Sequence, residues 1–365
     1  MSASQVNLRP PHRFLHVPLS LALPPRGLAA MILTAVLLLG SAVAIFLACE
    51  SFVNGIEFLG RRLQVGETAT GTILAAFGTA LPESVVTLVA TAFGTSVAQR
   101  QIGVGAALGG PLALSTVAYA AVGLALLAHA RRLGRGRACR VQVDHRRLSR
   151  DQAWFLAIFA ARIALGLVVF AVKPWTGCLF LAAYGLYFWR ELRGGEELEP
   201  PEIEPLKIRP RDPSPGLGWA LLQTLVSLAV IFVASRLFVA QLEAAGIWLG
   251  LSPQVAALLL SPVATELPKT VNALIWVRQG RERVALANIS GAMMIQATVP
   301  TAFGLLFTPW QLDRPLLLSA GVTVAAVLLL FLLFLLFRRG QVRGAYLAQV
   351  GWLYPVFAGA LMMLA

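Results

Sequence analysis

The chain has 365 residues, of which 58% are hydrophobic and only 13% are charged. Soluble domains carry about twice that share of charged residues, so a soluble protein of this composition could not cover its surface. The composition excludes soluble, disordered, fibrous and disulfide-scaffold classes and predicts an integral membrane protein. The formal net charge of +13 does not indicate a nucleic-acid partner, because arginine-rich cytoplasmic loops account for it.

Few side chains of the chain suit cofactor chemistry. The three cysteines have no CxxC spacing, which indicates neither a zinc site nor a disulfide framework. The four histidines lie in the N-terminal tail or in a polar loop, so no histidine relay crosses the membrane. The sequence has no P-loop for ATP. We therefore expect no cofactor and no enzymatic activity, and any coupling would come from ion gradients.

Ten apolar stretches of the length that a bilayer requires follow a Pro- and Arg-bearing tail, residues 1–28. Five fall in residues 29–190 and five in residues 217–365, and an acidic, Pro-rich linker of residues 191–216 separates them. The stretches lie near 29–60, 67–93, 102–128, 152–172, 174–189, 217–240, 253–277, 284–307, 315–337 and 345–364. We predict an all-α polytopic membrane protein with ten transmembrane helices and a solvated linker.

Basic residues are concentrated in the loops on one side of this arrangement. The loops on the linker's side contain Arg61, Arg62 and the arginines of residues 131–150, 278–283 and 338–343. The opposite loops contain only Arg100, Lys173 and Arg314. By the positive-inside rule, this asymmetry predicts a cytoplasmic linker, and the expected location is a bacterial inner (plasma) membrane.

The two halves of the chain are related by an internal repeat. Residues 43–94 align without gaps with residues 229–280. The matched positions include Thr79 with Thr265, Pro82 with Pro268, and Gly94 with Gly280. Because each half has five spans, an odd number, the second half must insert upside down. Inverted-topology repeats with interrupted helices at the midplane are a recurring plan of secondary transporters.

The second and seventh spans are predicted to be interrupted helices. Pro82 and Pro268 remove the helical hydrogen bonds to the carbonyl oxygens of Gly78 and Ala264. Such carbonyls survive in a bilayer only where protein or a wet cavity surrounds them. Together with hydroxyl and carboxylate oxygens, they suit hard cations such as sodium or calcium.

Three charged residues accompany these interruptions. Glu83 lies near the centre of its span, where a carboxylate normally marks an ion path or a paired charge. Glu266 and Lys269 are three residues apart, so they share one helix face and can form an ion pair. Lys269 either gates the site, substitutes for a cation or neutralises Glu83. Arg162, in the middle of the fourth span, is expected to pair with a carboxylate.

The third and eighth spans are expected to complete the site. In the eighth span, Asn288 is a candidate ligand or hydrogen-bond donor, whereas Ser290 and Gln296 are expected to form interhelical hydrogen bonds. In the third span, residues 103–110 have no polar side chain. Their small residues predict close helix packing.

These motifs resemble those of the cation/calcium antiporter superfamily, the sodium/calcium exchanger-like proteins. The family signature is G-T-S-L-P-E in the second and seventh helices and G-N-x-x-G-S-N in the third and eighth. Residues 78–83 read G-T-A-L-P-E and match closely, and residues 264–269 read A-T-E-L-P-K and match in part. The eighth span keeps Asn288 and Gly291, while the third has Ala106 where the family has asparagine.

The resemblance implies an antiporter that exchanges sodium or protons for calcium at a midplane site built around two glutamates. Carried over by position, the cation-binding residues include Thr79, Glu83, Thr265 and Asn288. Lys269 stands where the family has its second glutamate. Three outcomes fit this difference. Glu266, one turn back, replaces that glutamate, so that Glu83 and Glu266 bind calcium or sodium and Lys269 gates the site or compensates its charge; another cation or a proton is exchanged; or transport has been lost.

The sequence thus favours a secondary active cation antiporter that works by alternating access. Its expected partners are small inorganic cations and the lipid bilayer. One alternative is a transport-inactive or regulatory membrane scaffold that retains the exchanger fold, with Lys269 holding Glu83 in a permanent salt bridge. A passive channel is the third possibility.

Overall fold

The structure is a computed structural model of the whole chain, and it describes residues 27–62, 81–130, 140–194, 205–212, 215–336 and 341–364. Within these ranges nearly all elements are helices, as predicted. The first half contains α1 (Leu28–Arg62), the short helix Leu81–Ala92, α3 (Val97–Ala113), the π-helical turn η1 (Leu114–Ala118), α4 (Tyr119–Ala128), β1 (Arg140–Gln142), α5 (His145–Leu167), the 3₁₀ turn η2 (Lys173–Trp175) and α6 (Thr176–Gly194).

The second half begins after the linker and contains one more helical interruption. Its elements are α7 (Leu217–Leu249), α8 (Pro253–Thr265), α9 (Leu267–Arg278), α10 (Glu282–Phe307), α11 (Arg314–Leu336), β2 (Gln341–Arg343), α12 (Gly344–Val350) and α13 (Leu353–Leu364). Strands β1 and β2 pair antiparallel, with Arg140 opposite Arg343. This short ribbon joins a loop of the first half to a loop of the second.

Six helical stretches of the described residues are long and apolar enough to cross a membrane. They are Leu28–Leu59, Val97–Ala128, Leu217–Leu249, Glu282–Phe307, Arg314–Leu336 and Gly344–Leu364. Large apolar side chains are exposed along them; Val43 of α1 is 57% exposed and Val233 of α7 is 66% exposed. In water such faces would be unfavourable, whereas in a bilayer they meet lipid tails.

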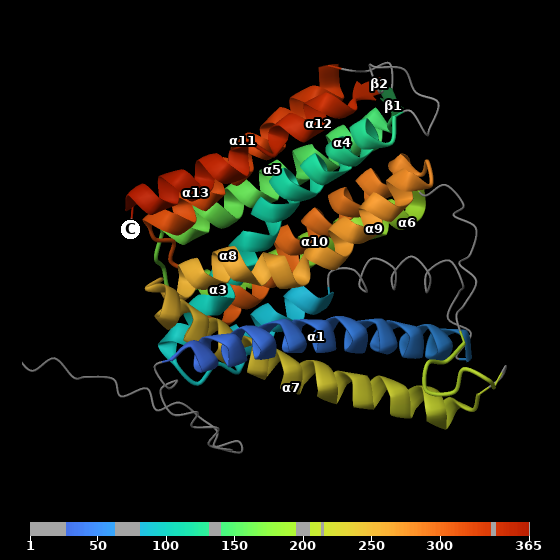
Figure 1. Cartoon of the computed structure of the whole chain (residues 1–365), viewed down its shortest axis with the longest axis vertical. Coiled ribbons are helices and arrows are strands. Elements are labelled where there is room, and N and C mark those ends of the chain that lie inside the picture. Colours follow the sequence, from blue (N-terminus) through green and yellow to red (C-terminus); the bar gives the residue numbers. More distant parts are fainter. Residues whose placement is uncertain are drawn as a thin grey trace, which may run out of the picture.

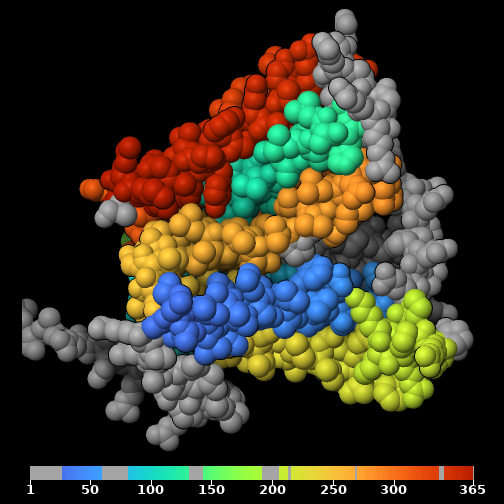
Figure 2. All heavy atoms as spheres, in the orientation of Figure 1, coloured from blue at the N-terminus to red at the C-terminus, as the bar shows by residue number. Residues whose placement is uncertain are grey.

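The helices form a bundle with α1 and α7 packed against each other along one side (Figure 1). In the interior, α3 packs on α8, and α10 packs on α5, α6 and α9. On the opposite side, α11 packs on α5 and α12 packs on α4. The space-filling view shows α1, then α8 and α9, then α4, then the C-terminal helices as successive bands across one face (Figure 2).

The seventh predicted span is interrupted, as the prolines indicate. Helix α8 contains Pro262 and ends at Thr265, and α9 begins at Leu267 with Pro268 in its first turn. Glu266 joins the two helices, with φ −100° and ψ −19°, and its N–H donates to the Pro262 carbonyl oxygen at 2.8 Å. Proline is tolerated in a first turn because the N–H there has no helical partner. The corresponding interruption of the second span falls in residues 63–80, outside the described residues.

The small residues of α3 allow its backbone to approach α8. A Cβ on Gly105 would overlap the carbonyl group of Gln254, and a Cβ on Gly109 would overlap the carbonyl oxygen of Leu258. The close packing predicted for residues 103–110 is therefore confirmed at these two positions. It brings the α8–α9 interruption into the centre of the bundle.

The last part of the linker is held against the bundle, whereas a solvated connection was expected. The Asn54 side-chain oxygen accepts hydrogen bonds from the Lys207 N–H at 3.1 Å and from the Gln223 amide at 2.9 Å. The Gln223 oxygen accepts from the Ile208 N–H at 2.9 Å, and Leu206 is fully buried. We call Asn54, Gln223 and residues 205–212 the linker clasp. It fixes the linker to α1 and α7 because buried amide groups replace water as hydrogen-bond partners.

Candidate functional site

Two carboxylates from different halves of the chain meet inside the bundle. Glu83 lies in the helical segment Leu81–Ala92, and Glu266 lies at the α8–α9 interruption. Their side chains are 1% and 3% exposed. The two carboxyl groups are close enough to share a hydrogen bond when one of them carries a proton. The arrangement is therefore a carboxylate pair built across the two halves.

Glu266 is the fully bonded member of this pair. Lys269 Nζ donates to both of its oxygens, at 3.1 and 2.9 Å, and is itself buried. Gln296 of α10 donates to Oε1 at 2.7 Å, and the Thr265 hydroxyl donates to the same oxygen at 3.2 Å. The ion pair between Glu266 and Lys269 confirms the contact that their spacing predicts. Such a pair neutralises Glu266 in the resting site.

Glu83 is the member with unused ligand capacity. Among the residues that the structure describes, neither of its oxygens has a hydrogen-bond partner, although both are buried. Gly110 of α3 packs directly against the carboxyl group, and a Cβ at that position would overlap Oε1. An ionised carboxylate in these surroundings is strongly disfavoured unless a cation or a proton accompanies it. Binding of a cation or a proton would therefore stabilise Glu83 more than any other group of this site.

Arg162 lies behind the carboxylate pair, fully buried in α5. Its guanidinium donates to the carbonyl oxygen of Ala107 at 3.0 Å and to that of Gln296 at 3.4 Å. It acts electrostatically on Glu83 but forms no ion pair with any carboxylate of the described residues. The prediction that Arg162 forms an ion pair with a carboxylate is therefore wrong for the described residues. Backbone carbonyl oxygens of α3 and α10 accept hydrogen bonds from its guanidinium instead.

The residues predicted on the eighth span, which is α10, lie at two levels of the bundle. Asn288 is half-buried and is not hydrogen bonded to Glu83 or Glu266. It precedes Gln296 on α10 by about 12 Å along the helix axis, so Gln296 takes the position at the carboxylates. Ser290 donates to Asp151 at 3.1 Å, an interhelical hydrogen bond as predicted. Thr79 lies outside the described residues.

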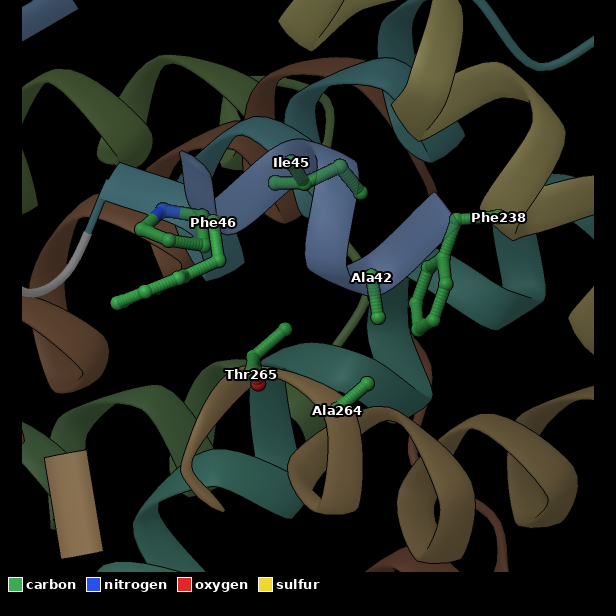
Figure 3. Close-up of a pocket in the computed structure, with 7 residues that line it drawn as sticks. Ala42, Ile45, Phe46, Phe238, Ala264 and Thr265 are labelled. Atoms are coloured by element: carbon green, nitrogen blue, oxygen red, sulfur yellow. The ribbon is translucent and has the colours of Figure 1, made fainter. Parts of the chain in front are cut away.

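A small recess reaches the α8–α9 interruption from the side of α1 and α7 (Figure 3). Ala42, Ile45 and Phe46 of α1 line it together with Phe238 of α7, and it ends at Pro82, Ala264 and Thr265. Its walls are mainly apolar, and the carboxylates are not among its lining residues. The Thr265 hydroxyl donates to Glu266. The side chain of Thr265 therefore separates the recess from the carboxylate pair.

The site offers a small number of oxygen ligands. Among the residues that the structure describes, no group of three or more His, Cys, Asp or Glu side chains is placed to hold a metal ion. The arrangement offers two carboxylates, one hydroxyl, one amide and the carbonyls at the helix interruption. Oxygen ligands of this kind suit hard monovalent or divalent cations and protons.

These features define a polytopic membrane transport protein with a buried carboxylate pair, and the chain belongs to the sodium/calcium exchanger family. The family model for the sodium/calcium exchanger protein matches residues 33–192 and 219–365. The superfamily resemblance seen in the motifs is therefore confirmed, and the chain is an integral membrane protein. Members of this family are transporters, in agreement with the expectation that the chain is not an enzyme.

Two bacterial proteins are similar to the chain over nearly their whole length. The inner membrane protein YrbG of Escherichia coli (strain K12) is 25% identical over 348 residues, which are 89% of this chain and 99% of YrbG. CaxA of Alkalimonas amylolytica is 24% identical over 342 residues, which are 90% of this chain and 100% of CaxA.

Two solved exchanger structures share the fold. The crystal structure of the H+/Ca2+ exchanger CAX has a TM-score of 0.66 and 16% sequence identity, and the match covers 91% of this chain and 86% of CAX. The sodium-calcium exchanger NCX_Mj, soaked with 2.5 mM Na+ and 0.1 mM Ca2+, has a TM-score of 0.54 and 19% identity, with 90% and 99% covered. These likenesses establish the architecture of the bundle.

Proposed function

We propose that this protein is a secondary cation antiporter with ten transmembrane helices in two inverted five-helix repeats, residues 29–190 and 217–365. The packing supports this plan: α6 packs on α10 as α12 packs on α4, while α1 with α7 and α5 with α11 pair across the halves. The tail 1–28 and the linker 191–216 lie outside the repeats. The linker would face the cytoplasm of a bacterial cell, with the bundle in the inner membrane.

The observation that carries the proposal is the buried carboxylate pair. Glu83 and Glu266 come from corresponding segments of the two halves, and within the described part of the chain neither oxygen of Glu83 has a hydrogen-bond partner. Buried ionisable residues inside a membrane protein mark ion or proton paths. The cation would therefore bind between Glu83 and Glu266, with Thr265 at its side.

The exchanged ions would be sodium or protons against calcium. The names of CAX and NCX_Mj give these two couplings for those proteins, and CaxA is named "Putative antiporter CaxA". From the resemblance, Thr79 and Asn288 would add oxygen ligands in a state in which they reach the carboxylates. Alternating access would then expose the same site to each side of the membrane in turn.

The scaffold alternative depends on what Lys269 does. One form of this alternative has Lys269 hold Glu83 in a permanent salt bridge. That form does not fit the structure, because Lys269 forms its salt bridge with Glu266. Glu83 is left without an ion-pair partner among the described residues. A lysine that pairs with Glu266 and leaves Glu83 open agrees better with a gate or a stand-in for a cation than with a locked scaffold.

Flux measurements in proteoliposomes test the proposal. With the purified full-length protein, a sodium or pH gradient should drive calcium or another cation uphill, and Glu83→Gln should abolish this flux. Glu50→Gln is the matched control, because Glu50 is a surface carboxylate paired with Lys207 at 2.9 Å. Uphill flux should survive in that variant.

The other functions predict different results in the same vesicles. A scaffold gives no flux with any cation and no change of thermal stability when cations are added. A channel gives downhill flux that does not depend on a counter-ion. Either result contradicts the antiporter proposal.

A further inference from the structure

Arg162 is a buried charge that the proposed exchange mechanism does not use. Its side chain is completely inaccessible, and its guanidinium lies 4.7 Å from the ring centre of Phe159 and 5.5 Å from that of Trp310. The Trp310 indole N–H donates to the Arg162 carbonyl oxygen at 3.1 Å, so the aromatic neighbour is itself fixed. An arginine enclosed in this way cannot swing out of the bundle to let an ion pass.

The two carbonyl oxygens that hold Arg162 are ones that helices normally do not offer. Ala107 and Gln296 each stand four residues before a proline inside a helix, Pro111 in α3 and Pro300 in α10. Proline has no N–H, so both carbonyls lack their helical hydrogen bond. Freed carbonyls of this kind are cation ligands in membrane transporters. The guanidinium of Arg162 therefore occupies a position with the chemistry of a cation site.

The same position lies within electrostatic reach of the carboxylate pair. Arg162 acts on Glu83, and its hydrogen bond to the Gln296 carbonyl places it on the residue whose amide binds Glu266. The charges of this centre are those of Glu83, Glu266, Lys269 and Arg162, which sum formally to zero. Glu83, Glu266 and Lys269 alone would sum to −1, and the charge of Arg162 cancels this.

We infer that Arg162 is a specificity-determining residue: a tethered cation that permanently fills one cation position and disfavours divalent ions at the neighbouring carboxylates. This inference rests on the proposed antiport function, because it assigns the class of cation to that same site. The physical basis is Coulomb's law, in which the repulsion between a fixed charge and an ion is proportional to the charge of the ion. A divalent cation therefore experiences twice the repulsion that a monovalent cation does.

This proportionality gives a signature that a purely structural arginine would not produce. When the fixed charge is removed, the fold-increase in affinity for a divalent ion should be about the square of the increase for a monovalent ion. An increase of roughly tenfold for Na+ would then correspond to roughly a hundredfold for Ca2+. A change of shape without a change of charge has no reason to follow this relation.

The test measures equilibrium binding of ²²Na+ and ⁴⁵Ca2+ to the purified full-length protein as wild type, Arg162→Gln and Arg162→Lys. We expect Arg162→Gln to raise both affinities in the stated proportion, and Arg162→Lys, which keeps the charge, to leave their ratio unchanged. Arg236→Gln is the matched control, because Arg236 also donates to a backbone carbonyl, that of Phe93 at 3.3 Å, but is exposed. It should leave both affinities unchanged.

Equal fold-changes for the two ions, or the same ratio change in Arg162→Lys as in Arg162→Gln, would overturn the inference. If Arg162→Gln does not fold, Arg162→Met supplies a neutral side chain that still packs between Phe159 and Trp310. Vesicle flux separates the two proposals, because wild type without uphill flux refutes antiport, whereas the affinity ratios refute only the role of Arg162.

Discussion

Gly110 shows at the scale of one residue how the site is shaped. The volume that a side chain would need at this position is filled by the Glu83 carboxyl group. We predict that Gly110→Ala displaces this carboxyl group and reduces gradient-driven cation flux to the background of empty vesicles. The free energy of unfolding should change by no more than about 1 kcal/mol, since alanine favours helix formation. Flux and thermal unfolding of the same preparation check both parts.

Gly291→Ala is the matched control for that substitution. Gly291 lies in α10, and a Cβ there meets nothing within 4 Å. Flux should stay at the wild-type level. If Gly110→Ala also transports normally, the Glu83 carboxyl group is not required in the position that the structure gives it.

Lys269 sets the charge at Glu266. Lys269→Glu removes the ammonium from both Glu266 oxygens and adds a carboxylate at the position where the family has one. We predict that the affinity for Ca2+ rises by roughly a hundredfold, because two units of charge change beside the ion. Calorimetric titration with CaCl2 in detergent measures this. An affinity that falls or stays undetectable would show that the electrostatic account of the site is wrong.

Site residues could be predicted from the sequence where the residue type and its place in the repeat indicate the contact. Glu83 and Glu266 flank prolines in repeated segments, so their approach follows from the repeat. The hydrogen bond of Gln296 to Glu266 depends on the rotation and depth of α10, which the sequence leaves open. The position of Arg162 depends on backbone carbonyl groups, which every residue has, so the sequence does not mark the ones that bind it. Its one available signal was proline four residues after each of them, Pro111 and Pro300.

At the scale of elements, the interrupted helix was predictable and the linker clasp was not. The break at Glu266 follows from local chemistry, because Pro268 removes a helical hydrogen bond wherever the chain lies. The clasp depends on Asn54 and Gln223, polar residues in two long apolar helices. Their meeting depends on how α1 packs against α7. The β1–β2 ribbon was missed for a similar reason, since its two short strands come from distant parts of the chain.

We predict that Asn54→Ala releases residues 205–212 from the bundle. The substitution removes the acceptor for the Lys207 N–H and for the Gln223 amide, a loss of about 1–3 kcal/mol of local stability for groups left without partners. Trypsin should then cleave after Lys207 and Arg211 several times faster than in the wild type; the bond between Arg209 and Pro210 is not a trypsin site.

Ser51→Ala controls for the loss of a polar side chain on the same helix. Among the described residues, the Ser51 hydroxyl donates only to the Leu47 carbonyl oxygen within α1, at 2.9 Å. Its cleavage rates should match those of the wild type. Equal cleavage rates in Asn54→Ala and the wild type would mean that the clasp does not hold the linker in solution.

At the scale of the whole molecule, α1 and α7 form a pair that contacts the rest of the bundle beside the site. The recess of Figure 3 lies at this boundary, between Ala42 of α1, Phe238 of α7 and Thr265 of α8. The pair is tied to the linker through the clasp, and the outer face of α1 is apolar from Leu28 to Leu47. If the pair moves relative to the bundle when the site changes sides, the recess is where side chains must have room to shift.

We therefore predict that Ala42→Phe blocks exchange without removing the binding site. A phenyl ring at this half-buried position fills the recess and holds α1 against the end of α8, because packed interiors do not accept added volume without a shift. Stabilisation of thermal unfolding by the bound cation should persist, while gradient-driven flux should fall by more than about tenfold if one conformation is favoured by about 1.4 kcal/mol. The neighbouring Val43→Phe, at a position 57% exposed on the outer face of α1, should retain both properties. Flux in Ala42→Phe equal to that in Val43→Phe would place the moving boundary elsewhere in the molecule.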